Sequence, residues 1–414
     1  MMGSRAWLAL LPQHTRLTAP RRRLRFGPVT RQRLVIVGAA AVLAMACVGD
    51  RGPAGDITRH HLVEELRVGD ESEPAYQFTA ISQIAVRDGA VYVRQQGQQE
   101  IRAFGFDGRH IRDIGRSGAG PGEFAGLESM GVVADTLWAI DGDLQRITLF
   151  RADGSVIETI PFTTSASLHA DGRRHFPYPK VLTRDGAVLG FGGWFGNDVA
   201  SGVTTSEPLL LMSRSGETRD TLGWVPLGND HLILRTDRRA MYRTQPFTDA
   251  PIKEYGATVG RIYVVEQADP ADPTTAVVRV TSVRATGDTA WSVAVPYLPT
   301  PLSRSRVDSV RTALLNGLGA VFPRDVIERA LYVPAYRAPI TEALASENGA
   351  LWLRWDDQTR PGTYSVIGSD GRLTAEVSVE PGVRIRWVSG DIAWGERVDD
   401  NDVPTLVRYR IVKS

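Results

Sequence analysis

A short two-strand pattern recurs between residues 85 and 394. In each copy, an apolar strand is followed by a tight polar turn and by a second strand in which aromatic or β-branched residues alternate with polar ones. Asp-Gly and Asn-Gly at several of the turns accept the positive φ angles that two-residue hairpins demand. The pattern therefore predicts six β-hairpins. They cover residues 85–93, 132–139, 181–189, 255–264, 344–353 and 387–394.

A second hairpin pattern lies between consecutive copies of the first. Together the two patterns make units of four antiparallel strands. The first turns of the early units, near residues 88, 135 and 185, are spaced like the blades of a β-propeller, which repeat every ~40–50 residues. The second pattern covers residues 104–111, 149–157, 211–218, 283–291 and 366–373.

The last unit lacks a fourth strand and ends with a single strand at 405–412. Residues 61–69 alternate between apolar and polar positions and precede the first unit. Pairing these two strands would close a ring and remove open sheet edges. We therefore predict an all-β fold over residues 60–414, a six-bladed β-propeller with a shared closing blade. A β-sandwich, or two unrelated β-domains, is the alternative.

The regular spacing is interrupted by long insertions after the third unit, and the largest covers residues 299–338. Within it, residues 303–318 carry apolar side chains at helical intervals, and Pro323 precedes a second helical stretch at 325–331. These patterns predict a small helical insertion between blades 4 and 5. Such an insertion would lie on the face of the propeller that is built by the b–c and d–a connections, where ligand sites are common.

The N-terminal segment has the organisation of an export signal. A basic stretch precedes the uncharged apolar run 34–46, whose 13 residues are too few for a transmembrane helix of ~20 residues. Leu43 to Cys47 resembles the lipobox of bacterial lipoproteins, which implies a diacylglyceryl group on Cys47. We expect a signal peptide at 1–46 and a flexible tether at 47–59. The alternative is an ordinary signal peptide followed by an unrelated cysteine.

Residues 115–124 (GRSGAGPGEF) resemble the glycine-rich turn of NHL-repeat propellers. The stretch occurs once, whereas blades of that family commonly repeat it. We expect the glycines to serve backbone geometry where the chain crosses from one blade to the next. Pro121 and the spacing of the glycines disfavour a phosphate-binding loop.

Removal of residues 1–46 would change the charge of the protein. Eight of the 48 basic residues lie in that segment, which leaves 40 basic and 47 acidic residues in the remainder. An acidic chain without a clustered basic stripe gives no indication of nucleic-acid binding. Lysine is rare, with only Lys180, Lys253 and Lys413 in the chain, and Cys47 is the single cysteine.

Motifs for metal binding and catalysis are weak. The expected b–c loops are acidic, and their carboxylates could hold Ca²⁺, although none matches a known calcium loop. Solvated acidic turns are the favoured interpretation, and we assign no cofactor and no catalytic residue. The histidines lack zinc-site spacing, and no G-x-S-x-G motif is present. The acidic residues are Asp141, Asp143, Asp269, Asp272, Asp356, Asp357, Asp399, Asp400 and Asp402.

Aromatic residues in the expected b–c loops are the candidate ligand contacts. Trp194 and Phe195 lie in the glycine-rich stretch 190–196, and Trp355 lies beside Arg354 and Arg360. Aromatic rings on loops can stack on a ligand or insert into a partner. Packing between blades is the alternative for Trp194 and Trp355, and it is favoured for Trp352 and Trp394.

These observations favour a non-enzymatic, membrane-anchored binding module that works outside the cytoplasm. Its partner would be a peptide, a protein of the envelope or a glycan, and its oligomeric state stays open. Val48 lacks the aspartate that retains some lipoproteins in the inner membrane, so the outer membrane is favoured. The resemblance to NHL-like propellers implies an alternative, a secreted metal-assisted lyase or lactone-type hydrolase with a site at the axial mouth. A structural subunit of an envelope assembly is a third hypothesis.

Overall fold

The structure is a computed structural model that describes residues 57–70, 72–163, 167–168, 174–194, 205–356, 360 and 362–414. These residues belong to one unit of the chain, Pro53–Ser414. Cys47, the expected signal peptide and most of the expected tether lie outside the described residues.

Each of the first four blades is an antiparallel sheet whose strands follow one another in the sequence. We call the four strands of a blade a, b, c and d, from the innermost to the outermost. Blade 1 contains β2 (Ile81–Arg87), β3 (Ala90–Gln95), β4 (Ile101–Gly105) and β5 (His110–Ile114). Blade 2 contains β6 (Leu127–Val133), β7 (Thr136–Asp141), β8 (Arg146–Phe150) and β9 (Val156–Pro161). Blade 3 contains β11 (Arg174–Leu182), β12 (Val188–Gly193), β13 (Ser206–Met212) and β14 (Thr218–Pro226), with the short β10 (Ser167–Leu168) beside β11. Blade 4 contains β17 (Ile252–Gly256), β18 (Arg261–Glu266), β19 (Val277–Arg284) and β20 (Thr289–Pro296).

The last two blades form one eight-stranded sheet. Blade 5 contains β21 (Ile340–Ala345), β22 (Leu351–Trp355), β23 (Thr363–Ile367) and β24 (Leu373–Ser378). Blade 6 contains β25 (Val383–Ser389), β26 (Ile392–Val398), β27 (Pro404–Lys413) and the N-terminal strand β1 (Thr58–Val68). Two short 3₁₀ helices, η1 (Pro74–Tyr76) and η2 (Pro273–Thr275), lie in loops. The predicted six-bladed β-propeller is therefore confirmed.

The N-terminal strand closes the ring, as the sequence predicts. β1 pairs antiparallel with β27, from His60 opposite Lys413 to Val68 opposite Leu406. The strand begins at Thr58, two residues before the expected start of the domain. It also pairs in parallel with β24, beginning at Thr58 opposite Ala375. This second pairing was not predicted, and it bonds the outer edges of blades 5 and 6 to each other.

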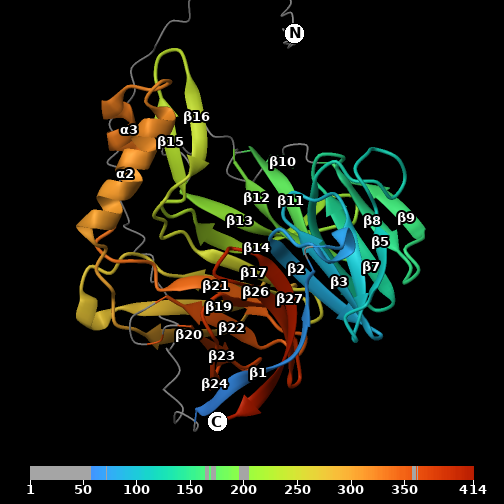
Figure 1. The fold of residues 1–414 in the computed structure, drawn as a ribbon. Coiled ribbons are helices and arrows are strands. Elements are labelled where there is room, and N and C mark those ends of the chain that lie inside the picture. Colours follow the sequence, from blue (N-terminus) through green and yellow to red (C-terminus); the bar gives the residue numbers. More distant parts are fainter. Residues whose placement is uncertain are drawn as a thin grey trace, which may run out of the picture. The chain divides into compact units, whose positions relative to one another are not determined.

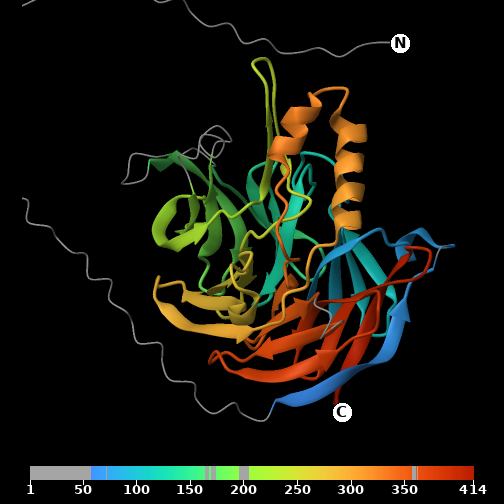
Figure 2. The same cartoon turned by 90° about the vertical axis from the view of Figure 1, so that its left-hand side faces the viewer.

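Two insertions stand together on one face of the propeller (Figures 1 and 2). The predicted helical insertion between blades 4 and 5 is present as α2 (Arg304–Leu318) and α3 (Arg324–Ala330). A second insertion, between blades 3 and 4, was missed: the hairpin of β15 (His231–Arg235) and β16 (Ala240–Thr244). We call residues 227–251 and 299–338 together the arch.

The arch has a small apolar core of its own. Leu232 and Leu234 of the hairpin are buried against helix-side residues that include Leu318, Phe322 and Ile327. The Gln245 side chain donates to the carbonyl of Ala330 (2.8 Å) and accepts from the backbone N–H of Tyr332 (3.2 Å). These contacts join segments that lie about 85 positions apart in the chain.

The glycine-rich turn after β5 has the structural role that we expected. Gly115 has φ +81°, and a Cβ there would lie 2.2 Å from the ring of Phe124. Phe124 is fully buried and packs against Phe150, with 6.0 Å between ring centroids. The turn thus inserts an aromatic anchor between blades 1 and 2. Trp352 and Trp394 are also buried, in agreement with the favoured packing hypothesis.

The order of strands within a blade fixes which loops share a face. The connections from b to c and from d to the next a meet at one face, which therefore carries the arch. Thr58 begins a d strand, and His60 pairs with Lys413 at the end of β27, so the chain enters the propeller at the opposite face, beside the C-terminus (Figure 1). In the described part of the chain, no helix is long and apolar enough to cross a membrane.

Candidate functional site

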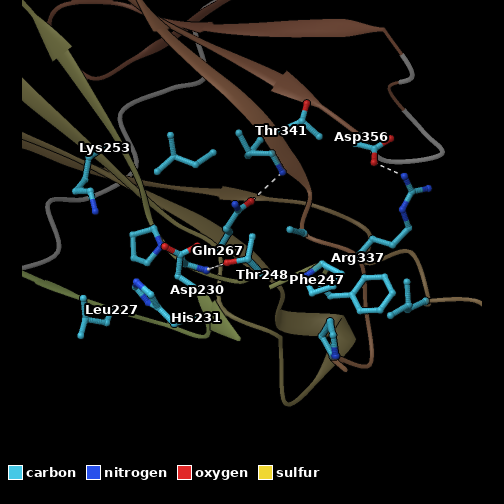
Figure 3. A pocket seen from close by; sticks show the side chains of 18 of the residues that line it. Leu227, Asp230, His231, Phe247, Thr248, Lys253, Gln267, Arg337, Thr341 and Asp356 are labelled. Carbon is cyan, nitrogen blue, oxygen red and sulfur yellow. Dashed lines mark hydrogen bonds and ion pairs between the residues drawn. The ribbon is translucent and has the colours of Figure 1, made fainter. Parts of the chain in front are cut away.

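A pocket of about 1060 Å³ opens beneath the arch, on the face of the b–c and d–a loops. Blade 3 provides one wall, the first strand of blade 4 provides the floor, and blade 5 with the arch provides the remainder. Figure 3 shows Lys253 on one side of this pocket and the pair of Arg337 and Asp356 on the other. A pocket of this size can surround a ligand of several rings.

Aromatic rings form the wall on blade 3. Tyr178 of β11 stacks on Phe191 of β12, with 5.3 Å between ring centroids and an interplanar angle of 18°. Tyr178 remains 39% exposed, so its ring is available to a ligand. Lys253 and Lys180 both approach the Phe191 ring, at 4.9 Å and 5.5 Å from its centroid. Two of the three lysines in the chain therefore lie at one aromatic ring, an arrangement stabilised by cation–π attraction.

A buried ion pair lies next to this wall. Lys253 of β17 donates to the carboxylate of Glu207 of β13, and only 7% of the Glu207 side chain is exposed. Burial raises the pKa of Glu207, and the ammonium of Lys253 opposes that rise. Asp230 and His231, at the base of the hairpin, also line the pocket near this pair. The pocket therefore combines hydrogen-bond donors and acceptors at one end.

The other end of the pocket has a second ion pair. Arg337 of the arch pairs with Asp356, which follows β22, and about half of each side chain is exposed. The backbone N–H of Arg337 donates to the carbonyl of Thr300 (2.9 Å). Gln267 also lines the pocket, and its side-chain oxygen accepts from the backbone N–H of Ile340 (2.9 Å).

One of the predicted contact residues lies in the pocket. Trp194 lines it, and its indole N–H donates to the carbonyl of Ser206 (2.7 Å). The Trp194 ring stacks with Trp224, with 6.2 Å between ring centroids, and makes a T-shaped contact with His175, with 5.9 Å between centroids. Phe195, its predicted partner, lies outside the described residues. Ligand binding by Trp194 stays a prediction.

The second predicted group is not brought together in the pocket. Trp355 is 1% exposed, and its indole N–H donates to the hydroxyl of Ser365 (2.8 Å). The Arg360 guanidinium covers the Trp355 ring at 3.5 Å from its centroid. Arg354 lies 3.7 Å from the carboxylate of Glu342 and does not line the pocket. This geometry corresponds to the packing alternative for Trp355.

Sequence reasoning missed the residues that form most of the pocket. Four of them lie on strands, where a polar or aromatic side chain fits the usual alternation of polar and apolar positions. They are Tyr178, Phe191, Glu207 and Lys253. Their common location follows only from the neighbouring positions of blades 3 and 4. The scarcity of lysine was the one available signal, because two of three lysines flank the same ring.

The comparisons with known proteins agree with this architecture. A family described as a 6-bladed beta-propeller matches residues 71–180, which span blades 1 and 2 and the start of blade 3. No curated protein matches the sequence. The propeller fold is thus supported by sequence as well as by topology.

Solved structures with the same architecture share little sequence with this propeller. A member of the duf4221 family from Bacteroides vulgatus is 12% identical, with coverage of 85% of this chain and 98% of that one and a TM-score of 0.43. Streptogramin B lyase is 11% identical, with the same coverages and a TM-score of 0.40. A PQQ-bound aldose sugar dehydrogenase from Streptomyces coelicolor is 12% identical, again with these coverages and a TM-score of 0.40. At this level of similarity, the likenesses assign no activity to the chain.

The acidic loops of the propeller serve its backbone. Asp141 accepts from the backbone N–H groups of Ala125 (2.8 Å), Gly126 (3.1 Å) and Leu144 (2.8 Å), and it is fully buried. The expectation of a solvated turn is therefore wrong for Asp141, because three donors replace water there.

The other acidic loops have similar local roles. Asp269 accepts from the N–H groups of Ala335 and Tyr336, at 2.8 and 3.1 Å. Asp272 and Asp399 cap their own loops. Within the described ranges, no group of three or more His, Cys, Asp or Glu is placed to hold a metal ion. Asp357 lies outside those ranges.

A second cavity, of about 390 Å³, lies among the innermost strands. Five of these six strands carry a bulge, which turns an extra residue out of the ladder. Glu128 lies 3.6 Å from Lys180 in this cavity, and Glu342 lies 3.6 Å from Arg386. Glu254 has no such cation among the residues that the structure describes, and burial raises its pKa to about 7.

Proposed function

We propose that this chain is a lipid-anchored, extracytoplasmic binding protein that holds a glycan in the pocket beneath the arch. The observation that carries the proposal is the pocket itself, with the exposed Tyr178 ring on one wall and ion-paired polar groups at both ends. The proposal rests on binding chemistry, and it assigns no reaction to the pocket.

The polar groups favour a ligand with hydroxyl groups. Hydroxyls both donate and accept, so they can bind to paired carboxylates and cations without displacing either partner. A ligand with a single strong charge inside the pocket would compete with the Glu207–Lys253 pair or the Arg337–Asp356 pair. The Tyr178–Phe191 stack supplies the apolar face against which the C–H face of a sugar ring can pack.

The position of the N-terminal strand is compatible with an anchor at Cys47. Thr58 lies on the face opposite the pocket, so a tether over residues 47–59 would approach the propeller from that side. A membrane-anchored protein with this layout would direct its pocket away from the lipid. The outer membrane is the expected location, since Val48 is not aspartate.

Screening of the full-length protein, purified in detergent, on an array of neutral and acidic oligosaccharides tests the binding proposal. We expect at least one class of glycan to bind, and we expect Tyr178→Ala to weaken that binding about tenfold because the stacking face is lost. Ile157→Ala, at an apolar side chain of similar exposure (44%) on β9, is the matched control. Absence of glycan binding, or equal loss with both variants, would contradict the proposal.

Labelling of cells with a fatty-acid analogue tests the anchor separately. The wild-type chain should incorporate the label, and Cys47→Ser should not. Undiminished label in the Cys47→Ser chain would show that the cysteine is not the acylated residue.

A further inference from the structure

The arch has the opposite charge to the rest of the exported chain. It contains ten arginines and six carboxylates, a net charge of +4. The chain from Cys47 onward has 40 basic and 47 acidic residues, so the part outside the arch has 30 basic and 41 acidic residues, a net charge of −11. A local positive region on an acidic protein attracts anions to that region alone.

Six of the arch arginines have no carboxylate partner among the described residues. The other four are paired: Arg311 with Asp308, Arg324 with Glu328, Arg329 with Asp325, and Arg337 with Asp356. The unpaired six are all exposed, and their charges are therefore available to a ligand. They are Arg235, Arg238, Arg239, Arg243, Arg304 and Arg306.

These arginines connect the pocket to the far end of the arch. Arg306 lines the pocket, close to the start of α2. His231, at the base of β15, also lines it, and Arg235 ends the same strand. Arg238 and Arg239 follow in the turn of the hairpin. A strand rises about 3.3 Å per residue, so Arg235 lies roughly 13 Å from His231 along β15, and Arg238 and Arg239 lie farther from the pocket.

We propose that the ligand of the pocket is an acidic glycan, whose uncharged rings occupy the pocket and whose carboxylate or phosphate groups bind the free arginines of the arch. This inference rests on the proposed glycan binding and adds the charge of the ligand to it. The charges that line the pocket are balanced, because three cations (Lys253, Arg306 and Arg337) are matched by three carboxylates (Glu207, Asp230 and Asp356). The arch supplies guanidinium groups, which bind carboxylates and phosphates through paired N–H donors.

The test compares two probes of equal length, hexagalacturonate as the carboxylated glycan and maltohexaose as the neutral one. In calorimetric titrations at low salt, the full-length protein should bind hexagalacturonate more tightly. Raising the salt from 50 to 300 mM should weaken that binding several-fold and leave maltohexaose unaffected. Arg235→Gln, Arg238→Gln and Arg239→Gln combined should weaken hexagalacturonate binding about tenfold, since each exposed charge contact contributes roughly twofold. The affinity for maltohexaose should not change.

A matched triple variant controls for total charge. Arg184→Gln, Arg219→Gln and Arg372→Gln remove three exposed arginines in or directly after turns on the opposite face, and hexagalacturonate binding should be retained. Equal affinity for both probes, without dependence on salt, would overturn the acidic-glycan inference and leave glycan binding intact. Binding of neither probe, together with an empty array screen, would instead overturn the proposed function. Arginine-dependent binding to vesicles with 30% phosphatidylglycerol, without binding to hexagalacturonate, would replace the glycan with an anionic membrane.

Discussion

Replacing Glu254 with glutamine should make the propeller more stable at alkaline pH and leave its stability at acidic pH nearly unchanged. Glu254 lies on the innermost strand of blade 4 and lines the axial cavity. Its carboxylate accepts from the backbone N–H of Ala345 (3.1 Å) and pairs with no cation in the described residues. Burial therefore raises its pKa from 4.5 to about 7, and the backbone hydrogen bonds offset only part of that rise.

The sign and size of the effect follow from proton linkage. Between pH 4.5 and about 7, the folded protein retains a proton on Glu254 that the unfolded chain has released. The free energy of unfolding therefore falls as pH rises through this window. At 1.36 kcal/mol per pH unit, a shift of about 2.5 units costs at most about 3 kcal/mol above pH 7. Glutamine keeps the acceptor for Ala345 and has no charge to bury, so it removes this cost.

Urea denaturation, followed by tryptophan fluorescence at pH 4.5, 6, 7 and 8.5, measures the difference. We expect Glu254→Gln to match the wild-type protein at pH 4.5 and to exceed its free energy of unfolding by up to about 3 kcal/mol at pH 8.5. Glu217→Gln, at an exposed carboxylate in the turn between β13 and β14, should change neither value. A stabilisation that is equal at pH 4.5 and pH 8.5, or its absence at pH 8.5, would refute the reasoning.

Three further changes test other contacts. Lys253→Met should lower the free energy of unfolding by about 3 kcal/mol at pH 8, because it leaves the Glu207 carboxylate buried without its cation. Adding Glu207→Gln to this variant should recover most of the lost free energy. Failure to recover it would show that lost packing, not charge, is responsible. Gly115→Ala should cost about 1–3 kcal/mol, since its φ is +81° and the Phe124 ring lies 2.2 Å from the new Cβ; Gly223→Ala, where the Cβ meets open space, is the control in the same urea titration. In a Cys47→Ser background, Leu62→Cys with Ile411→Cys should form a disulfide on mild oxidation, because these residues are Cα partners in the closing blade. Thiol titration measures formation of the disulfide. Leu62→Cys with Val407→Cys is the control, because these two residues are not partners in the register. Free thiols in the Leu62→Cys, Ile411→Cys variant would contradict the closure of the ring by β1 and β27.

The blades were predictable because the residues that specify each hairpin lie close together in the sequence. Each hairpin is encoded by alternating side chains and by turn residues such as Asp88 and Gly89, whose φ angles are positive as the turn type requires. The closing strand was predictable because the last blade lacked one strand and residues 61–69 alternated. The hairpin of β15 and β16 was missed because its strands have the same pattern as blade strands, and only their apolar contact with α2 and α3 separates them from the ring.

The pocket could not be predicted, because its residues meet only when blades 3, 4 and 5 pack side by side beneath the arch. Tyr178, Phe191 and Glu207 lie on three strands of blade 3, whereas Lys253 lies on blade 4 and Arg337 on the arch. Trp355 was predicted as a ligand contact and is buried instead. The sequence pattern of a tryptophan at the end of a strand does not depend on whether its ring faces a ligand or the core. By itself, the sequence determined the strands of the blades, their order and the closure of the ring. Tertiary structure decided which side chains share the pocket and which arginines stay unpaired, because burial and charge pairing depend on neighbours that are distant along the chain.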